Sequence, residues 1–202
     1  MPSKRHSTGL TGLVVLATWI YPIWPYEQAL HNSLTLMGAG YLWWYLQKNT
    51  LTNHHFFLIC LFLMAHSIAA RWLYSYVPYD QWAIQLWGTS VSEMFGWQRN
   101  HTDRVIHFLY GFCLTPAIIQ HFTQRDHLPI HIGLKLAIGM IMINSVCYEW
   151  FEWGIAMTLS PEDAEAYNGQ QGDMWDAHKD MLCATLGSVM WWFKYQGNTT
   201  AV

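Results

Sequence analysis

Charge is scarce in this sequence. Aspartate, glutamate, lysine and arginine together make up 11% of its 202 residues, and the formal net charge is -3. No cluster of lysine and arginine gives the chain the basic surface with which proteins bind a phosphate backbone. We therefore expect no nucleic-acid partner.

Cysteine is also scarce, and its spacing argues against two common uses. The four cysteines are Cys60, Cys113, Cys147 and Cys183. Each lies inside an apolar run, and no two of them form the CxxC pair of a thiolate zinc site or the pattern of a disulfide framework. We expect them to be small apolar filler in buried helices.

Apolar sequence is abundant instead. Hydrophobic residues make up 52% of the chain, with 13 tryptophans, and long weakly charged runs alternate with short polar joints. Several runs approach the ~20 residues that a helix needs to cross a bilayer. They lie near 9–23, 29–46, 55–77, 105–122, 130–159 and 176–194. A short basic stretch precedes the first run without a small-residue cleavage site, so we expect an uncleaved span there, a signal peptide being the alternative.

These runs predict an all-α fold, a polytopic transmembrane helical bundle of about six spans in a single integral membrane domain over 1–202. The segment 79–104 is too polar to span, and its spaced tryptophans predict an amphipathic or re-entrant segment between the third and fourth spans. Lysine and arginine are more frequent in the joints on the N-terminal side of the bilayer, which favours both termini in the cytoplasm (N-in/C-in). The segments 79–104 and 160–175 are then extracytoplasmic, and the lipid bilayer is a predicted partner.

The ionisable residues within these runs gather at one membrane level. In the predicted topology, the outer ends of the fourth, fifth and sixth spans hold acidic residues and a histidine at helical spacing. The pairs are Asp103 with His107, Glu149 with Glu152, and Asp176 with Asp180. Charged groups at membrane depth are costly and normally face a partner or a water-filled cavity. We therefore predict one buried polar site at the outer membrane face, with His66 from the third span and Asp173 at its rim.

The residue types at this site suit a divalent metal ion. Carboxylates and imidazoles without thiolates favour Mg²⁺, Mn²⁺, Fe²⁺ or Zn²⁺. The candidate metal ligands are His66, Asp103, His107, Glu149, Glu152, Asp173, Asp176 and Asp180. The same groups suit acid–base chemistry with or without a metal. The candidate catalytic residues are Asp103, His107, Glu149 and Asp176. Arg99 and Arg104 are placed either to bind a substrate anion, such as a lipid or cell-wall phosphate, or to brace the carboxylates.

Three motifs carry these residues, and together they resemble those of a known family. The motifs are Arg-Asn-His-Thr-Asp-Arg at 99–104 with His107, Tyr-Glu-x-x-Glu-Trp at 148–153, and Gly-Gln-Gln-Gly-Asp-Met-Trp-Asp at 169–176 with Asp180. The set is similar to that of the YjdF-like integral membrane proteins of bacteria, a family of unknown function. The resemblance implies a multi-pass protein of the bacterial inner membrane and supplies no reaction. The order of the motifs also resembles, more weakly, that of VanZ-like membrane proteins.

Three functions fit these features. The first is a metal-dependent membrane hydrolase or transferase that acts on an amphiphilic envelope substrate such as a lipid. The second is an ion-coupled transporter, which the sequence disfavours because the inner halves of the spans hold few polar residues besides Asn144. The third is a non-catalytic membrane scaffold in which Arg71, Arg99, Arg104 and Lys179 neutralise the carboxylates as an internal ion-pair network.

Overall fold

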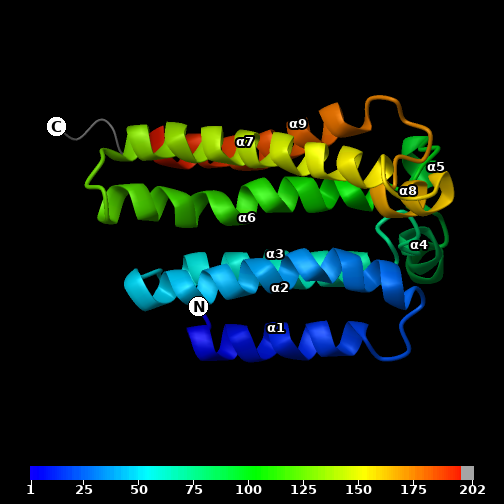
Figure 1. Ribbon diagram of the computed structural model, residues 1–202, viewed down its shortest axis with the longest axis horizontal. Helices are drawn as coiled ribbons and strands as arrows, with labels where there is room; N and C mark the ends of the chain where they lie inside the picture. The colour runs from blue at the N-terminus through cyan, green and yellow to red at the C-terminus, as the bar shows by residue number, and fades with distance from the viewer. Residues whose placement is uncertain (197–202) are drawn as a thin grey trace.

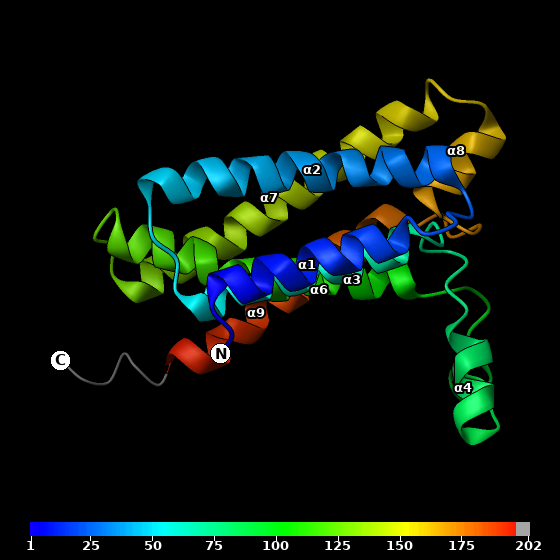
Figure 2. The same cartoon turned by 90° about the horizontal axis from the view of Figure 1, so that it is seen from below.

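The structure is a computed structural model that describes residues 1–196, and it is all-α as predicted. Long helices lie along the long axis of the molecule (Figure 1). They are α1 (Lys4–Thr18), α2 (Pro25–Lys48), α3 (Asn53–Ala70), α6 (Thr102–Gln124), α7 (Ile130–Ala156) and α9 (Asp176–Gln196). The short helices α4 (Tyr79–Trp87), α5 (Val91–Phe95) and α8 (Pro161–Asn168) all lie at the end of the bundle away from the start of α1, with α8 on the opposite side from α4 (Figure 2).

Among the described helices, α3, α6 and α7 are both long enough and apolar enough to cross a membrane. α1 has 15 residues. At about 1.5 Å per residue it is shorter than the ~30 Å hydrocarbon core of a bilayer. α2 and α9, with 24 and 21 residues, are long enough to cross but are less apolar than α3 and α7.

The third long helix is shorter than the apolar run that encodes it. The run predicted a span to residue 77, but α3 ends at Ala70. Leu73 and Tyr74 have positive φ angles of 46° and 57°, so the chain leaves the helical conformation there. The resulting turn carries Tyr74 into the interior, where it is 9% exposed.

α6 and α9 approach each other more closely than side chains would allow. A Cβ at Gly111 would lie 1.8 Å from the Ala184 carbonyl oxygen, and a Cβ at Gly187 would lie 2.1 Å from the Phe108 carbonyl oxygen. Glycine at both positions lets the two backbones touch. The contact brings the polar start of α9 alongside the polar start of α6.

The apolar core lies between α3, α6, α7 and α9 and includes Trp191. Cys60 and Cys113 are buried, which confirms their predicted use as apolar filler, and all four cysteines are free. The prediction is wrong for Cys147, which is exposed, and Cys183 is only half-buried. Both lie on helices whose other faces fill the core, so an apolar run around them did not decide their burial.

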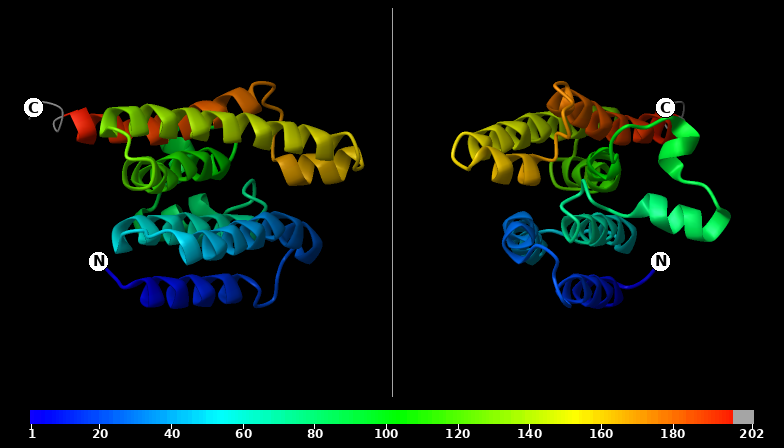
Figure 3. Two further views of the ribbon diagram at one scale, coloured as in Figure 1. Left: turned by 60° about the vertical axis from the view of Figure 1, so that its left-hand side comes forward. Right: turned by 90° about the vertical axis from the view of Figure 1, so that its right-hand side faces the viewer.

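The segment between α3 and α6 leaves the bundle. Residues 79–95 form α4 and α5, which we call the α4–α5 arm. Figure 2 shows α4 pointing away from the long helices at a steep angle, and Figure 3 shows the arm standing clear of them. Its large apolar side chains are exposed, among them Trp82, Leu86 and Trp87 at 42%, 76% and 57%.

Candidate functional site

Ion pairs centred on Arg104 join the start of α6 to the start of α9. Arg104 Nη2 lies 2.5 Å from Asp176 Oδ1, and Arg104 Nη1 lies 2.6 Å from Asp180 Oδ1. A third carboxylate, Asp173, is 3.2 Å from Nη2. Arg104, Asp176 and Asp180 are all buried. Because these charges are out of water, each depends on its partners for neutralisation.

Arg99 fastens the loop before α6 to the loop between α8 and α9. Its guanidinium pairs with both Asp103 and Asp176. It also donates hydrogen bonds to the carbonyl oxygens of Gly169 (3.2 Å) and Gln170 (3.1 Å). We call this set the Arg–Asp network. Its members are Arg99, Asp103, Arg104, Asp173, Asp176 and Asp180.

Asp173 lies at the rim of this network. Lys179 Nζ donates to Asp173 Oδ2 at 2.6 Å, and the Trp175 backbone N–H donates to Oδ1 at 3.1 Å. The hydrogen bond from Lys179 is the main reason that the pKa of Asp173 is lowered to about 2. His178, next to Lys179, is exposed and points away from the buried carboxylates of its helix.

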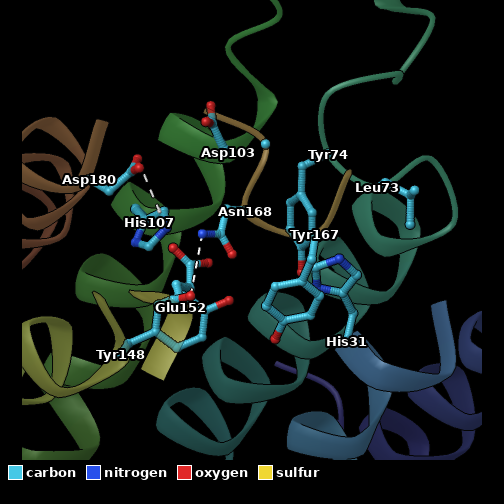
Figure 4. Close-up of a pocket in the computed structure, with 11 residues that line it drawn as sticks. His31, Leu73, Tyr74, Asp103, His107, Tyr148, Glu152, Tyr167, Asn168 and Asp180 are labelled. Carbon is cyan, nitrogen blue, oxygen red and sulfur yellow. Dashed lines mark hydrogen bonds and ion pairs between the residues drawn. The ribbon is translucent and has the colours of Figure 1, made fainter. Parts of the chain in front are cut away.

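A second group of side chains has the composition of a metal site. His107 on α6, Glu149 on α7 and Asp180 on α9 each offer a ligand atom, and these atoms lie within 4.8 Å of one another. His107 Nε2 is 3.9 Å from Asp180 Oδ1 (Figure 4). Glu149 Oε1 is buried and makes no hydrogen bond within residues 1–196. We call these three residues the His–carboxylate trio.

Asp103, Asp176 and Asp180 form another group whose carboxylate oxygens lie within 4.8 Å of one another. Here, however, Arg99 pairs with Asp103 and Asp176, and Arg104 pairs with Asp176 and Asp180. The two guanidinium groups therefore already match two of the three negative charges in this group. The trio is the better candidate for a metal ion because it adds the imidazole of His107 and the carboxylate of Glu149, whose buried Oε1 has no hydrogen-bond partner among the described residues.

A small cavity adjoins the trio. It has a volume of about 20 Å³ and is lined on one side by His107 and Asp180, and on the other by His31 and Tyr167 (Figure 4). Glu152 also lines it. A cavity needs roughly 10–15 Å³ to hold one water molecule. The site therefore has room for a water-sized guest next to His107 and Asp180.

The structure separates His66 from the other predicted ligands. His66 Nδ1 lies 2.7 Å from the Tyr74 hydroxyl, and its Nε2 lies 3.4 Å from the His31 carbonyl oxygen. Both ring nitrogens thus have protein partners in a cluster of imidazole and tyrosine rings. Glu152 lies in the cavity wall, one helical turn from Glu149, between the trio and this cluster of rings (Figure 4).

Arg71, which the scaffold hypothesis placed among the cations of the site, does not contact the carboxylates. Its guanidinium donates to the carbonyl oxygens of Thr18 (2.6 Å), Ile20 (3.0 Å) and Tyr21 (3.0 Å). Those carbonyls lie at the end of α1 and would otherwise lack helical partners. Arg71 therefore caps α1, and the hypothesis was wrong for this residue.

The sequence reading missed the polar face of α2. The second apolar run, 29–46, predicts a plain span, yet α2, which includes this run, carries a set of polar side chains that are all buried. They are Gln28, His31, Asn32 and Thr35. Their spacing of i, i+3, i+4 and i+7 is the signal that places them on one helical face.

Comparison with known proteins assigns the chain to a family. A family model described as "Predicted membrane protein (DUF2238)" matches residues 6–197. The chain belongs to this family. It is also 29% identical, over 147 residues, to the protein named "Inner membrane protein YjdF" of Escherichia coli (strain K12). That match covers 71% of this chain and 65% of the relative, so the chain spans less than two thirds of the relative's length.

These matches confirm the YjdF-like resemblance and the predicted inner-membrane localisation. No solved structure matches the chain.

Proposed function

We propose that this protein is a metal-dependent enzyme whose metal site is the His–carboxylate trio and whose substrate is an amphiphilic molecule of the cell envelope. The observation that carries the proposal is the convergence of His107, Glu149 and Asp180 from three separate helices at one end of the bundle. One imidazole and two carboxylates without thiolates suit Zn²⁺, Mg²⁺, Mn²⁺ or Fe²⁺.

A divalent ion in such a site supplies a Lewis acid for an ester or phosphoryl oxygen and activates water, as a hydrolase or transferase requires. The chain supplies the remaining groups. We assign Glu152, in the cavity wall, to proton transfer. Asp103 and Asp176 are also catalytic candidates, but each is engaged by arginine and neither belongs to the trio, so we assign them to bracing. Asp180, which Arg104 also engages, belongs to both the network and the trio. For the same reason we assign Arg99 and Arg104 to bracing rather than to substrate binding.

We further infer six spans with both termini in the cytoplasm, with local thinning of the bilayer around α1, which is shorter than the hydrocarbon core. α1, α2 and α9 lie alongside the three helices that are apolar enough to cross, and α1 begins near the end of the bundle where α9 ends (Figure 1). α1 and α2 expose large apolar side chains, as lipid-facing helices do, including Leu13 at 67%, Leu36 at 70% and Trp43 at 69%. The site and the segments 79–104 and 160–175 then face the outer side.

This orientation is open to a direct test. A reporter domain fused after Gln196 should be protected from external protease and labelling reagents. A reporter that is accessible from outside the cell would overturn the N-in/C-in orientation.

The α4–α5 arm supports an amphiphilic substrate. Its steep angle to the long helices lets it run along the membrane surface when those helices cross the bilayer (Figure 2). Trp82, Leu86 and Trp87 project from it, and tryptophan-rich amphipathic helices favour the interface between headgroups and acyl chains. The site would then open at the level where the polar part of a lipid-like molecule lies.

Metal analysis of the purified protein tests the proposal. The wild-type protein should carry a stoichiometric divalent ion, or take one up when Mn²⁺ or Zn²⁺ is supplied. His107→Ala and Glu149→Gln should lose it, whereas the matched control His178→Ala, which removes an exposed imidazole, should keep it. A wild-type protein that binds none of these ions would contradict the metal site.

The Arg–Asp network favours a second candidate, a non-catalytic scaffold. Arg104 and Arg99 neutralise several buried carboxylates without any ligand. A scaffold requires these ion pairs but not a metal ion at the trio. It would therefore unfold on loss of Arg104 and show no ion binding that depends on His107.

A further inference from the structure

The inward face of α2 is polar although the bundle around it is apolar. Gln28, His31, Asn32 and Thr35 are 0%, 1%, 5% and 7% exposed. The opposite face of the same helix carries exposed apolar residues such as Met37, at 70%. α2 thus turns polar groups inward and apolar groups outward, the reverse of a helix that faces water.

Most polar atoms on this face have no hydrogen-bond partner within the described part of the chain. They include both ring nitrogens of His31, both amide heavy atoms of Asn32 and the hydroxyl of Thr35. The Ser67 hydroxyl on α3 is also buried without a hydrogen-bond partner among the described residues. Buried polar groups in native proteins are almost always satisfied by protein or by ordered water. Groups this numerous on one face therefore point to a polar guest.

Two aromatic rings fix the His31 imidazole in place. Tyr167 stacks on it with ring centroids 4.4 Å apart and planes 6° from parallel, and Tyr74 meets it edge-on at 4.9 Å. A ring held between these partners cannot turn freely to find another protein group. Because His31 also lines the cavity beside the trio, the polar face of α2 borders that cavity at His31 (Figure 4).

The polar face stops before the C-terminal end of α2, where apolar side chains replace it. Leu42, Tyr45 and Leu46 pack there against the buried apolar cluster that contains Phe56 and Cys60. The polar groups therefore do not continue along α2 to the opposite end of the helix. A blind branch suits a stored guest and not the continuous ion path that a transporter needs.

We propose that the polar face of α2 lines a water-filled branch of the cavity, in which ordered water hydrogen-bonds His31, Asn32 and Thr35. Water is the guest of matching size and chemistry, because it both donates and accepts hydrogen bonds and the adjoining cavity is about 20 Å³. Its role as a water supply for a hydrolytic reaction rests on the proposed function. The hydration itself does not.

Water-edited solid-state NMR on the wild-type protein in lipid bilayers, labelled with ¹⁵N at histidine and asparagine, tests this branch. Magnetisation from water should reach the His31 ring and the Asn32 amide several times faster than the His66 ring, whose two nitrogens have protein partners. His31→Gln and His66→Gln assign the ring signals. Equally slow transfer to His31, Asn32 and His66 would show a dry face and overturn the proposal.

A pair of variants gives a second readout. His31→Phe fills the mouth of the branch with an apolar ring and should slow the transfer to Asn32. Ser33→Ala, which alters the exposed face of the same turn, should leave the transfer unchanged. Unchanged transfer to Asn32 in both variants would overturn the link between the branch and the cavity.

These results remain separable from the test of the metal site. Rapid transfer to His31 in a protein that binds no metal supports the branch and contradicts the proposed enzyme. Slow transfer in a protein that binds metal overturns the branch and leaves the enzyme standing.

Discussion

Replacing Arg104 with glutamine should destabilise the protein strongly. The substitution removes the cation that lies 2.5 Å from Asp176 and 2.6 Å from Asp180, while leaving both carboxylates in place. Arg104 is 8% exposed and the two aspartates are 5% and 2% exposed. Water cannot compensate charges at this depth, so the loss falls on the folded state.

The size of the effect follows from this burial. Removing one partner of a buried ion pair costs about 3–5 kcal/mol, chiefly because the remaining charge is left unpaired. In a chain of this length each kcal/mol lowers the melting temperature by about 2–4 °C. The melting temperature of Arg104→Gln should therefore lie roughly 6–20 °C below that of the wild type.

Thermal unfolding in detergent, followed by intrinsic tryptophan fluorescence, measures the difference. Arg125→Gln is the matched control, because Arg125 is exposed and donates to Asn49 Oδ1 at the surface, at 2.9 Å. Its melting temperature should change by no more than about 2 °C. If Arg104→Gln loses no more stability than Arg125→Gln, the Arg–Asp network does not hold α6 to α9.

Three further predictions concern the rest of the fold. Gly111→Ala should lower the melting temperature, because its Cβ would lie 1.8 Å from a carbonyl oxygen of α9. The control Gly139→Ala, with no atom within 4 Å of its Cβ, should not lower it. Equal effects of the two substitutions would contradict the close α6–α9 contact. Lys179→Gln should raise the pKa of Asp173, followed by ¹³C NMR, from about 2 toward 3.8. Because the folded pKa of this carboxyl is lowered, its stabilising contribution is present above 3.8 and is lost as the pH falls toward 2, so the wild type should lose stability there that the variant never had. Arg71→Gln should speed amide hydrogen exchange at residues 17–21, and unchanged exchange would refute its role in capping α1.

The all-α architecture and a buried cluster of carboxylates and imidazole were predictable from the sequence. Apolar runs between polar joints marked every long helix, closely for α6, α7 and α9, but the first run was displaced by five residues from α1 and the third extended seven residues beyond the end of α3. Within the spans, helical spacing placed Asp103 with His107 and Asp176 with Asp180, because residues four apart share a helical face. The glycines of α6 and α9 then bring those faces together, and the predicted cluster of carboxylates and imidazole results.

The pairing of the arginines was not predictable, because it depends on tertiary packing. Arg71 lies inside one apolar run and Arg104 lies directly before another, yet their positions did not show that one caps α1 and the other neutralises aspartates of α9. Positive φ angles at Leu73 and Tyr74 likewise carry no glycine or proline signal. His31 was different: the spacing of its polar face was visible, but its partner on α8, Tyr167, was not.

The claim that His107 is a metal ligand is tested most directly by pulsed electron paramagnetic resonance on protein loaded with Mn²⁺. An imidazole bound to the ion couples its nitrogen to the electron spin and gives a characteristic modulation. We predict this nitrogen signal in the wild type and in the His178→Ala control, and its loss in His107→Ala. A Mn²⁺-loaded wild type without nitrogen coupling, or one whose coupling survives His107→Ala, would contradict the account.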